Sequence, residues 1–239
     1  LRDGLLAELD PALRQRHHRE IGCAIEMVYA EDLTLHYGRL AHHFGQAAEV
    51  DRQRRYLQLA GEMAQASFAN EAAIDFYTQL LPLLDAATPR VSVLIQLGDV
   101  LHFVGQMDEA EQRWQEALAL ATALPDQAGQ ARSYLQLGRL RHGRSDFPAA
   151  LQFLARAQDI STAVADSRGL CDVLTVTGDC HYYLGQYSEA EAVLHPALAL
   201  AHELHDQRRT AAVLNHLGRT AFDQGNYETA QQRYEESLK

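Results

Sequence analysis

The sequence lacks any long run of apolar residues. None of its stretches approaches the roughly 18 apolar residues that a membrane-spanning helix needs, so we expect a soluble chain with no membrane partner. Cysteine is scarce, with only Cys23, Cys171 and Cys180 in 239 residues. The three form no CxxC pair and no even-numbered framework, so we expect small core residues in a reducing compartment, which indicates a cytoplasmic protein.

Positive charge is also scarce. Lysine and arginine number 21 against 32 aspartates and glutamates, so the net charge is 21 − 32 = −11. An acidic chain without a basic stripe repels phosphate backbones, which argues against direct nucleic-acid binding. Proline and glycine are modest, at 6 and 15 residues, while alanine, leucine, glutamine, glutamate and arginine dominate. This composition favours helices.

Sequences that would carry catalysis are missing as well. There is no GxSxG elbow, HExxH pair, paired-carboxylate signature or Walker-type GxxxxGK[ST] loop, so we expect no catalytic residues, no ATP binding and no cofactor. The twelve histidines include three close pairs: His17-His18, His42-His43 and His202 with His205. No further cysteine or histidine accompanies them locally, so no metal site is predicted.

What the sequence does contain is a repeat. Glycines recur every 40 residues, and an alanine lies twelve residues after each glycine. A large residue lies four residues after that alanine, and a second small residue lies seven residues after the same alanine. The four series are Gly98, Gly138, Gly178 and Gly218; Ala110, Ala150, Ala190 and Ala230; Trp114, Leu154, Leu194 and Tyr234; and Ala117, Ala157, Ala197 and Ser237. Four residue series with the same 40-residue spacing do not arise by chance, so the sequence contains an internal repeat.

Each repeat predicts two helices. Leu94, Leu97 and Leu101 share one face of an amphipathic helix, and the glycine and alanine positions let a second helix approach closely. Aspartates at 126, 166 and 206 precede helical patterns, where an N-cap is needed. A helix pair this short cannot bury its apolar face alone, so neighbouring pairs must stack.

The pattern resembles the tetratricopeptide repeat (TPR) motif, in the forms LxxLGxxL…AxxxWxxA, YxxLGxxR…AxxxLxxA and LxxTGxxH…AxxxLxxA. The resemblance implies an all-α, right-handed superhelix of antiparallel helix pairs. The usual period is about 34 residues, so a 40-residue period predicts longer helices. Arg141 and His181 depart from the motif, where a large apolar residue is expected, and so does Ser237.

Four such units are predicted, at 91–130, 131–170, 171–210 and 211–239. A divergent pair precedes them at 51–90, where Gly61 and Ala73 keep the twelve-residue offset. Residues 1–50 are predicted to form further divergent helices, including a pair at 11–28 and 31–45. The opening LRDGLLAEL lies inside an amphipathic pattern, and the stretch from it to Gly22 resembles the exit from an upstream winged-helix module.

The first third of the chain carries a second resemblance. LAHHF (40–44), YLQLAGEMA (56–64) and ANEAAIDFY (69–77) resemble the stretch that follows the nucleotide-binding and winged-helix modules of bacterial STAND-type signalling ATPases. These include LuxR-type and cyclase-linked regulators. The resemblance implies a regulatory arm that senses an inducer or partner, or that assembles protomers.

In a TPR superhelix the first helix of each pair lines a concave groove. The residues that this places in the groove are Asp99, His102, Phe103, Arg132, Arg139, His142, Asp179, Tyr182, Tyr183, Asn215, Arg219 and Phe222. One position alternates in sign along the array, through Glu62, Asp99, Arg139, Asp179 and Arg219.

Two interpretations of this alternation stay open. The charges could pair between neighbouring helices as a structural ladder, in which each exposed pair contributes about 0–1 kcal/mol. Alternatively, Arg132, Arg139 and Arg219 could bind ligand carboxylates while the aromatic residues anchor a peptide. We therefore predict a scaffold that binds protein or peptide in the groove. The alternatives are a small-molecule effector domain, and a homo-oligomer formed through the apolar face of residues 227–239.

Overall fold

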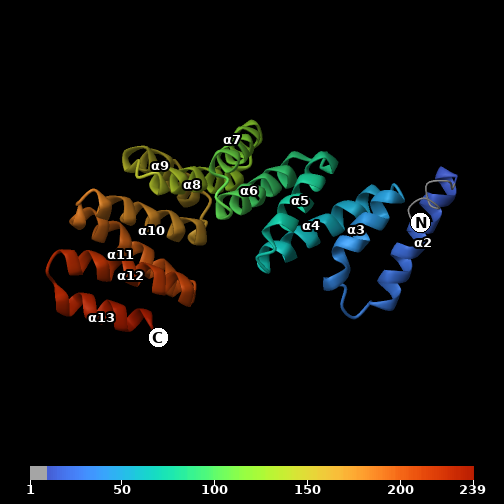
Figure 1. The fold of residues 1–239 in the computed structure, drawn as a ribbon. Helices are drawn as coiled ribbons and strands as arrows, with labels where there is room; N and C mark the ends of the chain where they lie inside the picture. Colours follow the sequence, from blue (N-terminus) through green and yellow to red (C-terminus); the bar gives the residue numbers. More distant parts are fainter. Residues whose placement is uncertain (1–9) are drawn as a thin grey trace. The chain divides into compact units, whose positions relative to one another are not determined.

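The computed structural model describes residues 10–239, and within them the chain is α-helical with short connections and no strand (Figure 1). The all-α solenoid of helix pairs expected from the sequence is confirmed. The segment LRDGLLAEL lies in residues 1–9, outside the described residues. The chain divides into two units, the first ending at Ala110 and the second running from Glu111 to Lys239, and each is described by itself.

Unit 1 consists of helices of unequal length, from 10 residues in α3 to 18 in α2. Its α-helices are α2 (Pro11–Val28), α3 (Tyr37–Gln46), α4 (Val50–Ala66), α5 (Asn70–Leu80) and α6 (Ala87–Phe103), with 3-10 turns η1 (Thr34–His36) and η2 (Leu81–Leu83). The expected pair at 11–28 and 31–45 is present, but its second helix starts later. Asp32 accepts a 2.9 Å hydrogen bond from the backbone N–H of Thr34, and this turn delays the helix until η1 begins.

The helices of unit 1 pack through glycine against an aromatic ring. Gly22 of α2 faces Phe44 of α3, and Gly61 of α4 faces Tyr77 of α5. Phe44 and Tyr77 are fully buried. Burial raises the pKa of Tyr77, and the nearby carboxylates Glu62 and Asp99 raise it further.

From α6 onward the helices follow the repeat with little variation. Helix α7 (Met107–Ala123) crosses the boundary between the units. Unit 2 then contains α8 (Gln127–Gly143), α9 (Phe147–Ala163), α10 (Ser167–Tyr183), α11 (Tyr187–Glu203), α12 (Gln207–Asp223) and α13 (Tyr227–Ser237). First helices begin at 87, 127, 167 and 207, four residues before the unit boundaries expected from the motif. Every helix from α6 to α12 has 17 residues, so the longer period lengthens the helices as predicted.

Most of the three-residue connections share one conformation, in which the middle residue has a positive φ. In three of them that residue is a glycine: Gly105, Gly185 and Gly225, with φ of 85°, 73° and 82°. The connection from α7 to α8 differs, because its middle residue is Pro125, whose ring keeps φ negative. The backbone N–H of Gln186 donates to the carbonyl of His181 at 2.9 Å, and Gly185 donates to Tyr182 at 2.9 Å. This is the Schellman termination, which satisfies the last carbonyls of a helix and reverses the chain within three residues.

Aspartate side chains cap the N-termini of α8, α9, α10 and α12 in unit 2. The Oδ1 atoms of Asp126, Asp166 and Asp206 accept from the backbone N–H groups of Gly129, Gly169 and Arg209 at 2.9, 3.0 and 3.0 Å. The caps predicted from the sequence are therefore confirmed. Asp146 caps α9 in the same way at 3.3 Å, a cap that the 40-residue series of aspartates did not include.

We expect Asp166→Ala to lower the free energy of unfolding by about 1 kcal/mol, because an N-cap side chain satisfies a helix N–H that is otherwise unpaired. The matched control is Asn226→Ala. Asn226 occupies the N-cap of α13 but its side chain makes no capping hydrogen bond, so its removal should change stability by less than about 0.5 kcal/mol. Urea unfolding followed by circular dichroism measures both. Equal losses in the two variants would contradict the capping role.

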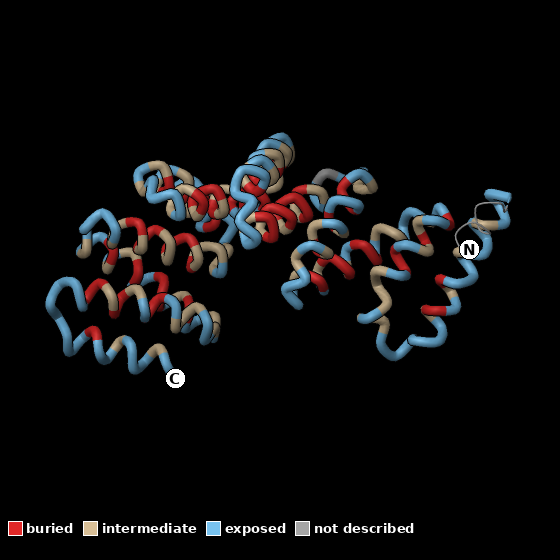
Figure 2. Tube along the Cα trace, in the orientation of Figure 1, coloured by how far each residue is buried: buried red, intermediate tan, exposed pale blue. Residues whose placement is uncertain are grey.

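Unit 2 packs as stacked hairpins. Helices α8 and α9, α10 and α11, and α12 and α13 form the pairs, while α10 also contacts α9 and α11 contacts α12. Buried residues lie along the seams between these helices (Figure 2). One core cluster gathers Leu174 and Cys171 of α10, Leu194 of α11 and Leu214 of α12. Each hairpin thus buries its apolar face against the next hairpin.

The departures from the motif are accommodated by polar contacts. Arg141 pairs with Glu111, which also lies 2.6 Å from Arg144, and the ring of His181 lies 2.7 Å from the side-chain oxygen of Gln186. Directly after α13, Leu238 is 87% exposed, whereas Leu198 at the same repeat position is 9% exposed because α12 covers it.

Candidate functional site

The candidate site is the face formed by the first helices of the pairs in unit 2, which we call the α8–α10–α12 face. Helix α10 contacts both α8 and α12. Asp caps, 17-residue lengths and identical connections hold the three helices in the same register. Residues 40 positions apart therefore occupy equivalent places on neighbouring helices, and the face presents rows of side chains on a rigid support.

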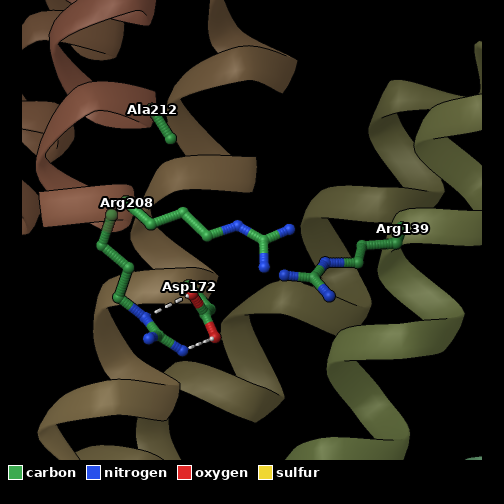
Figure 3. Close-up of a pocket in the computed structure, with 5 residues that line it drawn as sticks. Arg139, Asp172, Arg208 and Ala212 are labelled. Carbon is green, nitrogen blue, oxygen red and sulfur yellow. Dashed lines mark hydrogen bonds and ion pairs between the residues drawn. The ribbon is translucent and has the colours of Figure 1, made fainter. Parts of the chain in front are cut away.

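A pocket of about 300 Å³ opens on this face. Arg139 of α8, Asp172 of α10, and Arg208, Arg209 and Ala212 of α12 line it. We call it the arginine pocket. In the close-up of Figure 3, the side chains of Arg139 and Arg208 point toward one another across it.

Arg209 is fully engaged at the wall of the arginine pocket. Its Nε and Nη2 atoms donate to the two oxygens of Asp172 at 2.9 and 2.8 Å (Figure 3), and its Nη1 donates to Asp206 at 2.5 Å. The hydrogen bond to Asp172 is the largest cause of the raised pKa of Arg209. The backbone N–H and the side chain of Arg209 in turn lower the pKa of Asp206. Bidentate geometry of this kind fixes both partners.

The other arginines here are different. Arg139 makes one hydrogen bond, a weak 3.4 Å contact to Gln136. Within residues 10–239, none of Arg132, Arg139, Arg168 and Arg208 lies within ion-pair distance of a carboxylate. Arg132, Arg139 and Arg168 line a second pocket of about 260 Å³, which shares Arg139, Asp172 and Arg209 with the first.

Two turns further along α10, Asp179 lies between one arginine and two histidines. Its Oδ2 lies 2.8 Å from Nε2 of His142, its Oδ1 lies 3.2 Å from Nδ1 of His216, and it pairs with Arg219. The Asp179 side chain is only 13% exposed. Burial alone would raise the pKa of this carboxyl, but the contacts with His142, His216 and Arg219 outweigh burial and lower it.

Aromatic side chains lie beside this cluster. The guanidinium of Arg219 lies 4.0 Å from the ring centroid of Tyr182 and 5.2 Å from that of Tyr183, within cation–π range. The hydroxyl of Tyr182 donates to Asp223 at 2.5 Å; this hydrogen bond, together with burial, raises the pKa of Tyr182 to about 12. Tyr183 stacks on Phe147 at 5.2 Å yet is 52% exposed. It offers a flat apolar ring to a ligand.

The structure brings together most of the predicted groove residues of unit 2. Arg132, Arg139, Asp179, Tyr182, Tyr183 and Arg219 lie in the pockets and clusters just described, with His142. Asn215 instead accepts a 3.0 Å hydrogen bond from Ser237 of α13, and Phe222 lines an apolar pocket with α13 residues. Asp99, His102 and Phe103 belong to α6 in unit 1, where the exposed Phe103 lies 5.8 Å from Phe68.

The charge ladder forms only in part. Asp179 and Arg219 pair between α10 and α12, as the ladder interpretation expects. Arg139 does not pair with Asp179, because His142, one turn further along α8, takes that place. Arg219 therefore has the role that the structural ladder assigns to it. Arg132 and Arg139 remain candidates for binding ligand carboxylates.

Three functional candidates were missed from the sequence. Arg168 and Arg208 lie at the second residue of α10 and α12, where motif alignment assigns them to the connection between repeats. Their 40-residue spacing was the available signal. His216 escaped because its contact with Asp179 depends on how α12 packs on α10, and the motif does not record that packing.

The paired histidines partly come together. The Nδ1 atoms of His18 and His43 lie 3.0 Å apart, and the ring of His42 lies 5.8 Å from that of His18. Burial lowers the pKa of His18, as do the charges of His42 and Arg14. In residues 10–239, no group of three or more potential ligands has a geometry that could hold a metal ion. Nor is any helix in this range long and apolar enough to cross a membrane.

Comparison with known proteins gives one family. The family model described as "Tetratricopeptide repeat" matches residues 90–163 and 172–239, more than half of the chain. No curated protein matches the sequence.

Solved structures similar to this chain share its fold at low identity. BtubC from P. vanneervenii is 16% identical with a TM-score of 0.69, over 92% of this chain and 89% of that protein. The STAND signal transduction ATPase with a tetratricopeptide repeat sensor from Pyrococcus horikoshii is 13% identical with a TM-score of 0.74, over 97% of this chain. The Rap conjugation gene regulator of plasmid pLS20, in complex with the Phr* peptide, is 13% identical with a TM-score of 0.69, over 82% of this chain. This chain spans 37% of the STAND protein and 55% of the Rap regulator.

Proposed function

The chain belongs to the tetratricopeptide repeat family, and we propose that it is a scaffold that binds a protein or peptide rather than an enzyme. The binding surface is the α8–α10–α12 face. In the wider protein, the chain serves as the sensor or assembly arm of a bacterial signalling or transcription regulator.

The observation that carries this proposal is the composition of the face. It combines arginines that have no carboxylate partner among the described residues with an exposed, stacked tyrosine, all on capped helices. Arginine and tyrosine are the residue types that contribute most to protein recognition, because they add contact area and directed hydrogen bonds at low entropic cost. Rigid helices reduce that cost further.

The dimensions of the face suit an extended peptide. Asp172 at the arginine pocket and Tyr183 are eleven residues apart on α10, which at 1.5 Å per residue is about 16 Å. An extended chain covers about 3.3 Å per residue, so five or six peptide residues span the distance. A peptide of that length could contact the arginines and the aromatic cluster together.

The similar proteins support the same ligand class. One is a Rap regulator described in complex with the Phr* peptide, and another is a STAND protein described as having a tetratricopeptide repeat sensor. The regulatory role also agrees with the resemblance of LAHHF (40–44) and ANEAAIDFY (69–77) to STAND-type regulators.

The proposal predicts that Tyr183→Ala weakens peptide binding at least tenfold, because an exposed aromatic anchor contributes on the order of 2 kcal/mol at such surfaces. Peptides would first be selected from a random displayed library with the unmodified chain. Their affinities would then be measured by isothermal titration calorimetry for Tyr183→Ala and for a control, Gln152→Ala, at an exposed position of α9.

Retained affinity in Tyr183→Ala, within twofold of Gln152→Ala, would remove this face as the binding surface. A library that yields no binding peptide would overturn the proposed function itself.

A further inference from the structure

The arginine pocket contains two like charges that face each other. Arg139 comes from α8 and Arg208 from α12, and their guanidinium groups converge over the wall that Asp172 and Arg209 form (Figure 3). Neither guanidinium forms an ion pair with Asp172, whose two oxygens accept from Arg209. Two cations that converge without a direct ion-pair partner repel each other, and an anion bound between them removes this repulsion.

A second anion position adjoins the first. Arg132 and Arg139 of α8 and Arg168 of α10 line it. Arg168 and Arg208 are 40 residues apart and occupy the same position on successive first helices, the second residue of α10 and of α12. The repeat thus places two basic side chains in one row, and Arg139 lies between the two positions.

We propose that these adjoining positions bind two carboxylates of an acidic peptide, with Arg139 shared between them. This inference rests on the proposed function and names its ligand class. Guanidinium groups bind carboxylates through two parallel N–H···O bonds, which gives them orientation as well as charge. The carboxylate between Arg139 and Arg208 would complete the pocket that the two side chains already define.

The rest of the chain favours a peptide over a nucleic acid. Four exposed or half-exposed arginines gather here in a chain of net charge −11, so the positive potential is local. Asp166 and Asp172 line the same pockets and would repel a continuous phosphate backbone. A peptide with two acidic residues, by contrast, presents charge only where the arginines lie. It also carries side chains that reach the aromatic cluster.

The test uses fluorescein-labelled peptides of twelve residues in a Gly/Ser/Tyr background, each with two glutamates separated by one to six residues. A matched set has glutamine at the same positions. Fluorescence anisotropy at low and moderate salt measures binding to the unmodified chain, to Arg139→Gln and to Arg208→Gln. The control is Arg156→Gln, which removes the same charge from an exposed position on α9. Circular dichroism confirms that each variant is folded.

We expect the best glutamate peptide to bind at least tenfold more tightly than its glutamine counterpart. Arg139→Gln should weaken it at least tenfold and Arg208→Gln several-fold, while Arg156→Gln changes affinity less than twofold. Charge reversal by Arg208→Glu should abolish binding of the glutamate peptide and raise the affinity for a third peptide, which has lysine in place of the two glutamates.

Equal affinity for the glutamate and glutamine sets would overturn the inference, as would losses in Arg139→Gln and Arg208→Gln no larger than in Arg156→Gln. Citrate, inorganic phosphate or single-stranded DNA that binds the pocket as tightly as the best peptide would overturn the assignment to a peptide. If library-selected peptides bind through Tyr183 without dependence on glutamate, the inference fails while the proposed function stands. If no peptide from either source binds, both fail.

Discussion

Replacing Gly178 with valine is expected to lower the free energy of unfolding by about 3 kcal/mol, the upper part of the range for overpacked cores. A Cβ atom at this position would lie 2.5 Å from Cγ of Leu194, far inside van der Waals contact. Leu194 of α11 is fully buried in a core cluster with residues of α10 and α12. It cannot move away from α10 without disturbing its packing against the rest of that cluster. Interiors packed at crystal density transmit such a displacement to their neighbours.

The matched control is Gly143→Val near the end of α8. A Cβ there meets no atom within 4 Å, and valine has a somewhat higher helix propensity than glycine. This variant should therefore be neutral or slightly more stable. Chemical denaturation measures both, and hydrogen exchange should show that the loss in Gly178→Val begins in α10 and α11, because each hairpin contacts only its neighbours. Similar stabilities for the two variants would show that the glycine series does not mark close helix contacts.

The helical architecture was predictable because its determinants are local and repeated. Glycine or alanine at a seam and aspartate at an N-cap each act within a few residues, and each recurs every 40 positions. Once one hairpin is understood, the others follow. Unit 1 was less predictable because a single turn, closed by Asp32 on Thr34, shifted the start of a helix and nothing in the repeat signals it.

The candidate site was predictable only as a face. Helical periodicity places Arg139, Asp179 and Arg219 on the first helices, but it does not decide which carboxylate each arginine contacts. That choice depends on side-chain reach between helices. Arg209 takes Asp172, and His142 takes the place beside Asp179 that the charge alternation assigned to Arg139. Only the structure, which shows these pairs, identifies the arginines that have no carboxylate partner among the described residues.

The two halves of the face consequently have different physical roles. At the start of α12, Arg208 defines the arginine pocket together with Arg139, which reaches it from the later part of α8, and neither has a carboxylate partner among the described residues. Near the ends of α10 and α12, Asp179 pairs with Arg219 and contacts His142 and His216, and Arg219 packs on Tyr182 and Tyr183. The ion cluster thus supports the aromatic rings that a peptide would contact. Weakening it should affect both the stability of unit 2 and the shape of the aromatic surface.

Asp179→Asn tests this role, since it keeps the shape of the side chain and removes its charge. We expect the free energy of unfolding at pH 7 to fall by about 2 kcal/mol, because a mostly buried carboxylate that contacts three basic groups loses charge-assisted interactions and leaves Arg219 without its counter-ion. The control is Asp159→Asn, at an exposed position of α9, where the change should be less than about 0.5 kcal/mol.

The difference between the unmodified chain and Asp179→Asn should also depend on pH. The folded state lowers the pKa of Asp179, so between that value and the ordinary value of about 3.9 the unfolded chain binds more protons than the folded one. The stabilisation is therefore fully present above about pH 5 and is lost as the pH falls through the pKa of the folded state. Urea unfolding at pH 5, 4 and 3 should show that the difference in the free energy of unfolding narrows at each step down in pH. A difference that stays constant down to pH 3, or one no larger than that of Asp159→Asn, would mean that the charge of Asp179 does not hold the cluster together.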